Sequence, residues 1–314
     1  MSQEPRILIC GSMAFDTICV FPGKFADHIV SGATHKINVS FLVENMRREF
    51  GGCAGNIAYS LKMLGGAPVI CAAIGDDGAD YRDRMAKLGI GLDALRAVPG
   101  SFTANCHITT DLDDNQITSF HAGAMFRSQV NDVTAVDNIA LGIVAPDGRD
   151  GMFKHARGFA SKKIPFIFDP GQAMPAFSGD EIAELIGMAD YLSVNDYEAE
   201  MIAQKTGRAI ESFAPGLKAL IVTLGAAGSR VYTDGRMVDV PVVPASALVD
   251  PTGCGDAFRA GLLYGIAHGW SVEKACKLGS LVGSIKIAER GGQNHNFTEP
   301  AIRARFAEVW GERW

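Results

Sequence analysis

The stretch that decides the fold is DPTGCGDAFRAG, residues 250–261. A valine-rich strand pattern over residues 238–243 runs up to it, and Phe258, Leu262 and Ile266 follow at the four-residue spacing of a helix. A Gly-x-Gly turn that leads into a helix leaves backbone N–H groups unpaired, and the helix dipole adds to them. The stretch therefore predicts an anion site suited to phosphate. Asp256 lies beside this predicted anion site. It is either a helix-capping acid or the acceptor of a proton from a hydroxyl that attacks phosphorus.

Short apolar runs alternate with helical patterns along most of the chain. The predicted strands are residues 6–10, 68–74, 139–144, 165–169, 191–194 and 219–223, and helical patterns cover residues 56–64, 180–189 and 198–205. This alternation predicts an α/β fold with a doubly wound, mainly parallel sheet and helices on both faces. Ligands then bind beyond the carboxyl ends of the strands. RVYTDGRMVDVPV, residues 230–242, predicts a hairpin with Asp234-Gly235 at its turn.

Two stretches depart from that pattern. Residues 17–50 contain HKINVSFLVENM, and residues 102–121 contain FTANCHITTDLDDNQITSF. Both alternate as antiparallel strands do, and neither has a helical pattern beside it. We therefore expect a large α/β domain of residues 1–16, 51–101 and 122–314, and a small β-sheet lid of residues 17–50 and 102–121.

Composition and motifs exclude several classes of protein. The 314 residues carry a net charge of −6, which argues against a nucleic-acid or membrane partner. Seven cysteines without C-x-x-C spacing, no signal-peptide pattern and no apolar run of about 20 residues predict a cytoplasmic protein with reduced thiols. There is no P-loop motif, and the one G-x-G-x-x-[GA] match, residues 89–94, follows a helical pattern and predicts a loop. A nicotinamide oxidoreductase is accordingly disfavoured.

The motifs resemble those of one family. DPTGCGDAFRAG resembles the C-terminal signature of the ribokinase-like (PfkB) small-molecule kinases, and GGCAGNIAYSLKMLGG, residues 51–66, resembles their N-terminal signature. SVNDYEAE (193–200) and TLGAAG (223–228) resemble the intermediate motifs, so the likeness covers nearly the whole chain in the family's order. HKINVSFLVENM, ITSFHAGAM and SVNDYE are most similar to bacterial adenosine kinases. One departure is Cys254, where the family usually has a small residue such as Ala.

The resemblance implies a reaction, a set of catalytic residues and the residues that bind ATP and its ions. The expected reaction is ATP-dependent phosphorylation of the 5′-hydroxyl of a nucleoside, adenosine to AMP, with Mg²⁺ as cofactor. Asp256 would be the base, and backbone N–H groups of Gly253, Cys254 and Gly255 would form the anion hole for the transferred phosphoryl group. The residues that the resemblance places near ATP and its ions are Asn195, Thr223, Gly225 and Gly228 for ATP, Glu198 for Mg²⁺ through water, and Asp250 with Thr252 for a monovalent cation such as K⁺.

The resemblance also implies an acceptor pocket. Its residues are Ser12, Asp16, Ser40, Gly52 and Asn56 for the sugar, with Phe120 and Gln172 for the base. Structural alternatives stay open for several of them. Asn56 is also a good N-cap, Phe120 fits a core position, and Glu198 suits the first turn of its helix.

Other functions remain open as well. A kinase of another nucleoside, or of free ribose or fructose, would keep the same mechanism with a different pocket. A non-catalytic ligand-binding protein on this scaffold is a third hypothesis. The expected partners are the nucleoside and ATP, and the lid permits a homodimer.

Overall fold

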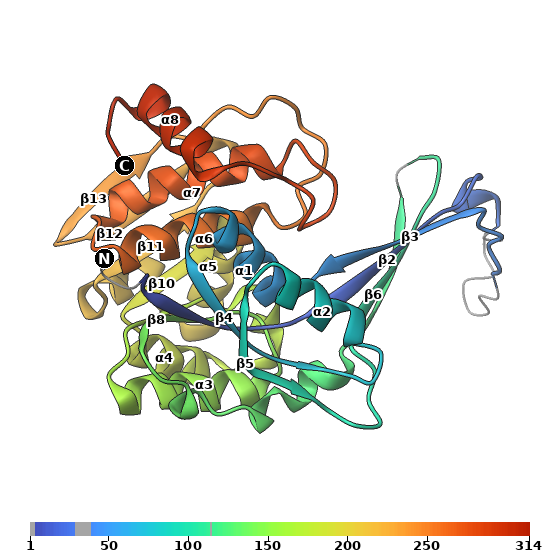
Figure 1. Ribbon diagram of the computed structural model, residues 1–314, viewed down its shortest axis with the longest axis horizontal. Helices are drawn as coiled ribbons and strands as arrows, with labels where there is room; N and C mark the ends of the chain where they lie inside the picture. The colour runs from blue at the N-terminus through green and yellow to red at the C-terminus, as the bar shows by residue number, and fades with distance from the viewer. Residues whose placement is uncertain (1–3, 29–38, 114) are drawn as a thin grey trace.

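The computed structural model describes residues 4–28, 39–113 and 115–314. Strands in these residues form a nine-stranded sheet in the order β13-β12-β11-β10-β9-β8-β1-β4-β5 (Figure 1). Its strands are β1 (Arg6–Cys10), β4 (Ala67–Ile74), β5 (Gly91–Ala97), β8 (Ile139–Val144), β9 (Phe166–Phe168), β10 (Tyr191–Asn195), β11 (Ala219–Thr223), β12 (Ser229–Thr233) and β13 (Arg236–Val240). Only the pairings of β12 are antiparallel, so the sheet is the mainly parallel one that the alternation predicts.

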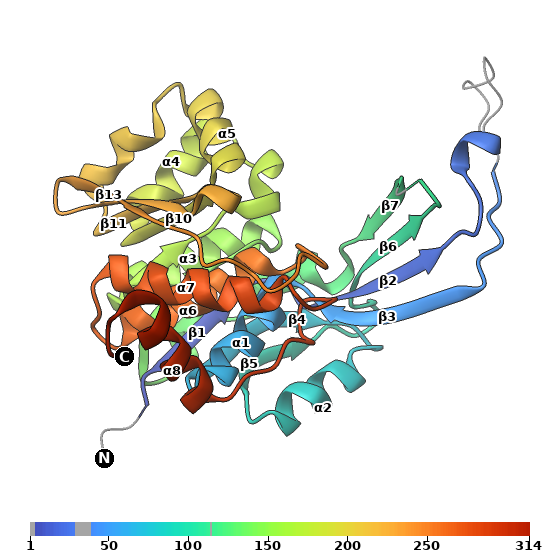
Figure 2. The same cartoon turned by 90° about the horizontal axis from the view of Figure 1, so that it is seen from above.

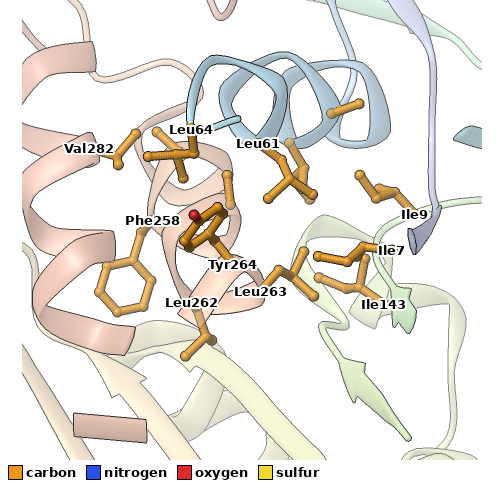
Figure 3. Close-up of a cluster of buried hydrophobic side chains, with 14 of the residues drawn as sticks. Ile7, Ile9, Leu61, Leu64, Ile143, Phe258, Leu262, Leu263, Tyr264 and Val282 are labelled. Atoms are coloured by element: carbon orange, nitrogen blue, oxygen red, sulfur yellow. The ribbon is translucent and has the colours of Figure 1, made fainter. Parts of the chain in front are cut away.

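Helices cover both faces of this sheet. They are α1 (Cys53–Met63), α2 (Ala79–Lys87), α3 (Arg149–Lys162), α4 (Gly179–Met188), α5 (Asp196–Thr206), α6 (Cys254–Ala267), α7 (Val272–Lys286) and α8 (Glu299–Trp310). Side chains of β1 alternate between two cores: Ile7 and Ile9 pack with α1, α6 and α7, whereas Leu8 and Cys10 pack with α3 to α5. Figure 3 shows the first core, with Leu61 of α1 beside the side chains of α6. Among the described residues, no helix is both long and apolar enough to cross a membrane.

Helices α6 and α7 pack backbone against backbone. A Cβ on Gly261 would lie 2.5 Å from the backbone nitrogen of Gly279, and one on Gly279 would lie 2.7 Å from the carbonyl oxygen of Phe258. Glycine in a helix interior costs up to about 1 kcal/mol, and here the close contact requires it. The two helices therefore form one rigid unit.

Most strand predictions are confirmed, and the hairpin turns at Asp234 and Gly235, both with positive φ. Two predictions are wrong. Strand β13 ends at Val240, because Pro241 has no N–H to continue a ladder, so no strand runs up to the glycine turn at 253–255. Residues 89–94 do not form a loop throughout, since β5 begins at Gly91 and pairs with β4.

A second, four-stranded sheet extends away from the large one (Figure 2). Its order is β3-β2-β6-β7, with β2 (Ala14–Val20), β3 (Asn45–Gly51), β6 (Ala104–Thr110) and β7 (Gln116–His121). Strands β2 and β6 pair in parallel, and the other pairs are antiparallel. The strand predicted over HKINVSFLVENM is wrong for residues 39–44, which are irregular, and residues 35–38 lie outside the described residues. We call this sheet the lid; its division from the large domain stays a prediction.

Candidate active site

The predicted site residues gather at the carboxyl ends of the parallel strands. Asp16 lies in β2, shortly after the end of β1, and Asn195 and Thr223 end β10 and β11. The sheet order reverses beside β1, because the chain continues to β4 and β5 on one side and to β8 through β11 on the other. Such a reversal is where ligands bind in open α/β sheets.

Asp256 lies in the first turn of α6 and is held from the neighbouring helix. Gly253 caps the helix with φ 77°, and the side-chain Nδ2 of Asn56 donates to Asp256 Oδ2 at 2.8 Å. Burial raises the pKa of Asp256, while the Arg259 guanidinium and the Asn56 amide oppose that rise. The carboxylate is thus fixed in place with a raised proton affinity, which suits a proton acceptor.

Asn56 is itself locked by buried partners. It is the fourth residue of α1 and only 4% exposed, so the prediction that it caps the helix is wrong. Its Oδ1 accepts from Gln293 Nε2 at 3.1 Å, and Gln293 is 2% exposed. At the N-terminus of α1, the hydrogen-bond acceptor is Ser12 instead. Its Oγ accepts from the backbone N–H of Cys53 at 3.2 Å. Gly52 is required here, because a Cβ would lie 2.6 Å from the carbonyl oxygen of Ser12.

The three backbone N–H groups expected to form the anion hole are not equivalent. That of Cys254 donates to the carbonyl of Pro251 at 3.1 Å. Those of Gly253 and Gly255 have no acceptor in the part of the chain that the structure describes. Burial raises the pKa of the Cys254 thiol, so the thiol is protonated at neutral pH and is a poor nucleophile. The site therefore presents two free N–H groups beside Asp256.

An ion pair that the sequence reasoning missed lies next to Asp256. Arg259 Nη2 donates to Asp169 Oδ1 at 2.8 Å, and the Asp169 side chain is 1% exposed. Burial alone would lower the pKa of Arg259, but Asp169, Asp256 and Glu198 together raise it. Two sequence features could have indicated this ion pair. Arg259 follows Asp256 at the three-residue spacing of one helix face, and Asp169 ends a predicted strand.

Asn195 and Glu198 cap α5 reciprocally. Glu198 N donates to Asn195 Oδ1 at 2.7 Å, and Asn195 N donates to Glu198 Oε2 at 2.8 Å. The helix-end alternative for Glu198 is therefore confirmed. The other carboxylate oxygen accepts no hydrogen bond from the described residues. A single carboxylate with a spare oxygen fits Mg²⁺, which keeps most of its waters and takes its other ligands from phosphates.

The turn after β11 is closed as predicted. Leu224 N donates to Gly228 O at 2.8 Å, and Gly228 N donates to Gly225 O at 3.1 Å. Gly228 has φ 93°, and a Cβ there would lie 2.2 Å from the carbonyl oxygen of Val240. Thr223 Oγ1 donates to Val194 O at 3.4 Å, which ties this turn to β10.

One face of the lid sheet points toward α6. Glu49, Asp16, Cys106 and Phe120 pair directly across the four strands, so their side chains share that face. Burial raises the pKa of Asp16 to about 6, and the carboxylates of Glu49, Asp250 and Asp256 add to the rise. Asp16 is therefore close to the other acids of the site.

The two residues predicted to bind the base, Phe120 and Gln172, and Ser40, predicted for the sugar, take no part in these hydrogen bonds. Phe120 is 53% exposed, so the core alternative is wrong for it. Ser40 and Gln172 are exposed, and their side chains make no hydrogen bond to other described residues. The structure thus brings Ser12, Asp16, Gly52 and Asn56 to the site and places Phe120 on the lid face that carries Asp16, while Ser40 and Gln172 make no side-chain hydrogen bond to these described residues.

Asp250 organises the loop before α6. Its Oδ1 accepts from Thr252 N at 2.9 Å, and its Oδ2 accepts from Gly291 N at 2.8 Å. Burial raises the pKa of Asp250, but these N–H groups more than offset the rise, so the carboxylate stays ionised. The carbonyl of Asp250 accepts from the Lys286 ammonium at 2.8 Å.

Comparison with known proteins agrees with this geometry. Residues 19–299 match the model of the pfkB family carbohydrate kinases. The structure of a Burkholderia thailandensis nucleoside kinase in complex with inosine is 47% identical, with a TM-score of 0.88 over 98% of this chain and 99% of that one. The same protein in complex with ADP-inosine has a TM-score of 0.86 over 98% of this chain and 97% of that one.

Two more distant relatives are consistent with this family match. A nucleoside kinase of Methanothermobacter thermautotrophicus is 29% identical over 99% of this chain and 98% of its own length. A ribokinase of Thermotoga maritima, 21% identical over 96% of this chain and 99% of its own, has a TM-score of 0.78, which shows a shared ribokinase-like fold. The chain belongs to the pfkB family of carbohydrate kinases and is a phosphotransferase with an alcohol group as acceptor.

Proposed function

We propose that the chain is an ATP-dependent nucleoside kinase that phosphorylates the 5′-hydroxyl of adenosine. The observation that carries the proposal is the Asp256 carboxylate, fixed by buried Asn56 at the glycine-capped end of α6 beside two free N–H groups. A proton acceptor next to an anion hole is what phosphoryl transfer to a hydroxyl requires.

In this proposal Asp256 accepts the proton of the 5′-hydroxyl as the oxygen attacks the γ-phosphorus of ATP, and the bond from that phosphorus to the β–γ bridging oxygen breaks to release ADP. The N–H groups of Gly253 and Gly255 stabilise the charge on the phosphoryl oxygens, and the N–H of Cys254 joins them if its bond to Pro251 opens. Arg259 lies close enough to Asp256 to oppose the rise in its pKa and so keeps the carboxylate available as a base.

The nucleotide would lie across the ends of β10 and β11. Asn195, Thr223, Gly225 and Gly228 occupy those ends and are assigned to ATP. Glu198 would hold Mg²⁺ through water, and the ion would neutralise charge on the phosphates.

The acceptor would lie between α6 and the lid. Asp16 accepts hydrogen bonds from the ribose hydroxyls, Asn56, Ser12 and the backbone at Gly52 line the sugar, and Phe120 stacks on the base. Ser40 and Gln172 are assigned to the nucleoside by the family resemblance alone. The relative in complex with inosine supports a nucleoside in this place and makes inosine the second candidate acceptor.

Two further features belong to the proposal. The lid face opposite Asp16 carries Met46, Cys19, Thr109 and Ile117 in one row, with Met46 and Ile117 exposed, which supports a homodimer through the lid. All seven cysteines are free, which supports a reducing, cytoplasmic location.

The test is an ADP-release assay with Mg²⁺-ATP against adenosine, inosine, guanosine, ribose and fructose at several concentrations. The expected result is the highest kcat/KM for adenosine, with inosine next. Turnover of free sugars alone would contradict the nucleoside assignment, and no turnover of any acceptor would favour a ligand-binding protein.

A further inference from the structure

Lys286, the last residue of α7, is a buried cation without a carboxylate partner. Its side chain is 0% exposed, and its ammonium donates to two backbone carbonyls, those of Asp250 at 2.8 Å and Glu289 at 2.9 Å. No ion pair with an acid within 4.0 Å is found for it in the described residues. Buried lysines are rare unless paired, so the position calls for an explanation beyond packing.

The two carbonyls belong to the two segments that shape the anion site. Asp250 begins the turn that leads to Gly253, and Glu289 precedes Gly291, whose N–H is bound by Asp250 Oδ2. The N–H groups of Val249 and Asp250 both donate to the carbonyl of Ile287, at 2.9 and 3.1 Å. The ammonium thus lies at the centre of a small network that joins residues 249–252 to residues 286–291.

Carbonyl oxygens from two loops are also the ligands that a dehydrated K⁺ ion takes in proteins. An ammonium group is close to K⁺ in size and charge. The carbonyl of Asp250 is therefore already engaged by a cation, and the expectation of a monovalent ion at Asp250 and Thr252 does not fit the residues present.

The charge also acts on the site itself. Lys286 lowers the pKa of both Asp256 and Cys254 against the effect of their burial. Burial lowers the pKa of Lys286, and the Cys254 thiol, Asp250, Glu289 and Asp256 oppose that fall. The Lys286 ammonium can therefore both bind the backbone of the turn that begins at Asp250 and favour the ionised form of Asp256.

We propose that the Lys286 ammonium is a built-in monovalent cation that holds the 250–253 turn in its phosphate-binding form, so that the kinase needs no free K⁺. Lys286 is a positioning residue in this proposal, since it touches the backbone of the turn and not the substrate. The inference rests on the proposed kinase function for its activity readout only.

The experiment compares the chain as it stands with Lys286→Ala, which opens room for an ion, in buffers with K⁺, NH₄⁺, Na⁺ or Li⁺ as the sole monovalent cation. For the unmodified chain we expect the same kcat and Tm in all four salts. For Lys286→Ala we expect kcat to fall on the order of tenfold or more in Na⁺ or Li⁺, the scale for a lost electrostatic contact, and to recover in K⁺ and NH₄⁺.

Lys274→Ala is the matched control. Lys274 lies on the same helix, and its ammonium also donates to a carbonyl, that of Arg313 at 2.7 Å, far from Asp250 in the chain. Its activity should not depend on the salt. Lys286→Gln keeps an N–H donor without the charge and serves where the alanine variant does not fold; K⁺ should not rescue it as fully, since the side chain fills the space.

Thermal unfolding without substrate separates this inference from the proposed function. A Tm of Lys286→Ala that rises in K⁺ but not in Li⁺ supports the cation role even if no nucleoside is turned over. Activation of the unmodified chain by K⁺ of several-fold, or an alanine variant equally impaired in every salt with no selective rise in Tm, would overturn the proposal.

Discussion

The N-terminal end of α6 and the lid sheet face each other across the candidate site, but they are built differently. At α6 three side chains of the site have buried partners: Asp256 with Asn56, Asn56 with Gln293, and Arg259 with Asp169. On the lid, all of β7 is exposed, and Phe120 contributes an aromatic ring with no polar anchor. In the proposed mechanism, the catalytic groups at α6 are therefore already in position, whereas the lid side of the acceptor pocket takes its final form when the acceptor binds.

The largest effect is expected from Asp256→Asn. This variant keeps the size of the side chain at the N-terminal end of α6 and removes the carboxylate that is proposed as the base. We expect kcat to fall by a factor on the order of 10² or more, the scale of lost general-base catalysis. Nucleoside affinity, measured by calorimetry, should change little. Asp180→Asn is the control, because Asp180 is an exposed first-turn acid of α4. Near-normal turnover of the Asp256 variant would remove this residue from the mechanism.

A smaller effect is expected from Phe120→Ala on the lid. Stacking of a base on an aromatic ring is worth about 1–3 kcal/mol, so the KM for nucleoside should rise on the order of tenfold while the KM for ATP stays constant. Thr118→Ala is the matched control, since Thr118 is exposed on the same face of the same strand. Equal rises in both KM values would argue against stacking and against an acceptor pocket on this face.

The smallest effect is expected from pH. Nucleoside affinity should depend on pH through Asp16, which lies in the lid sheet and is close to the acids at α6. Its pKa of about 6 means that the carboxylate is half protonated at pH 6, so nucleoside affinity should fall about twofold there relative to pH 8 and further at pH 5. Binding measured by calorimetry from pH 5 to 8 tests this. Asp16→Asn should bind more weakly at every pH, with no such decline; an unchanged decline in the variant would assign the titration to another group.

The same raised pKa has a consequence for stability. The folded-state value lies above the ordinary 3.8, so the contribution of Asp16 to folding is fully present below pH 3.8 and is lost as the pH rises through about 6. At pH 8 the ionised, partly buried carboxylate is therefore destabilising. Asp16→Asn should raise the Tm at pH 8 by a few degrees, and this gain should vanish near pH 4.

Much of the large domain could be predicted from the sequence because it depends on local patterns. Buried parallel strands are short apolar runs, and the Asp234-Gly235 turn needs two positive φ values that this pair tolerates. Asp256 and its glycines could be identified for the same reason, since a Gly-rich turn before a helix is a local signal.

The residues that support the site could not be predicted, because their partners are distant in the chain. Asn56 is a plausible N-cap by sequence, yet its side chain binds Asp256 and Gln293, which lie 200 and 237 residues further along the chain. Lys286 ends an ordinary amphipathic helix, and only the fold shows that its ammonium is buried against two carbonyls. The irregular segment at 39–44 also escaped prediction, since its alternation imitates a strand that finds no partner among the described residues.

The contact of Gly261 with Gly279 has an evolutionary consequence. Neither position accepts a side chain without moving α6 relative to α7, and these two helices carry the glycine turn and Lys286. Larger side chains are therefore excluded at the helix crossing, whereas the exposed strand β7 has room for other side chains. In the proposed kinase, substitutions of lid side chains such as Phe120 can therefore change the preferred acceptor without disturbing the helix crossing that supports Asp256.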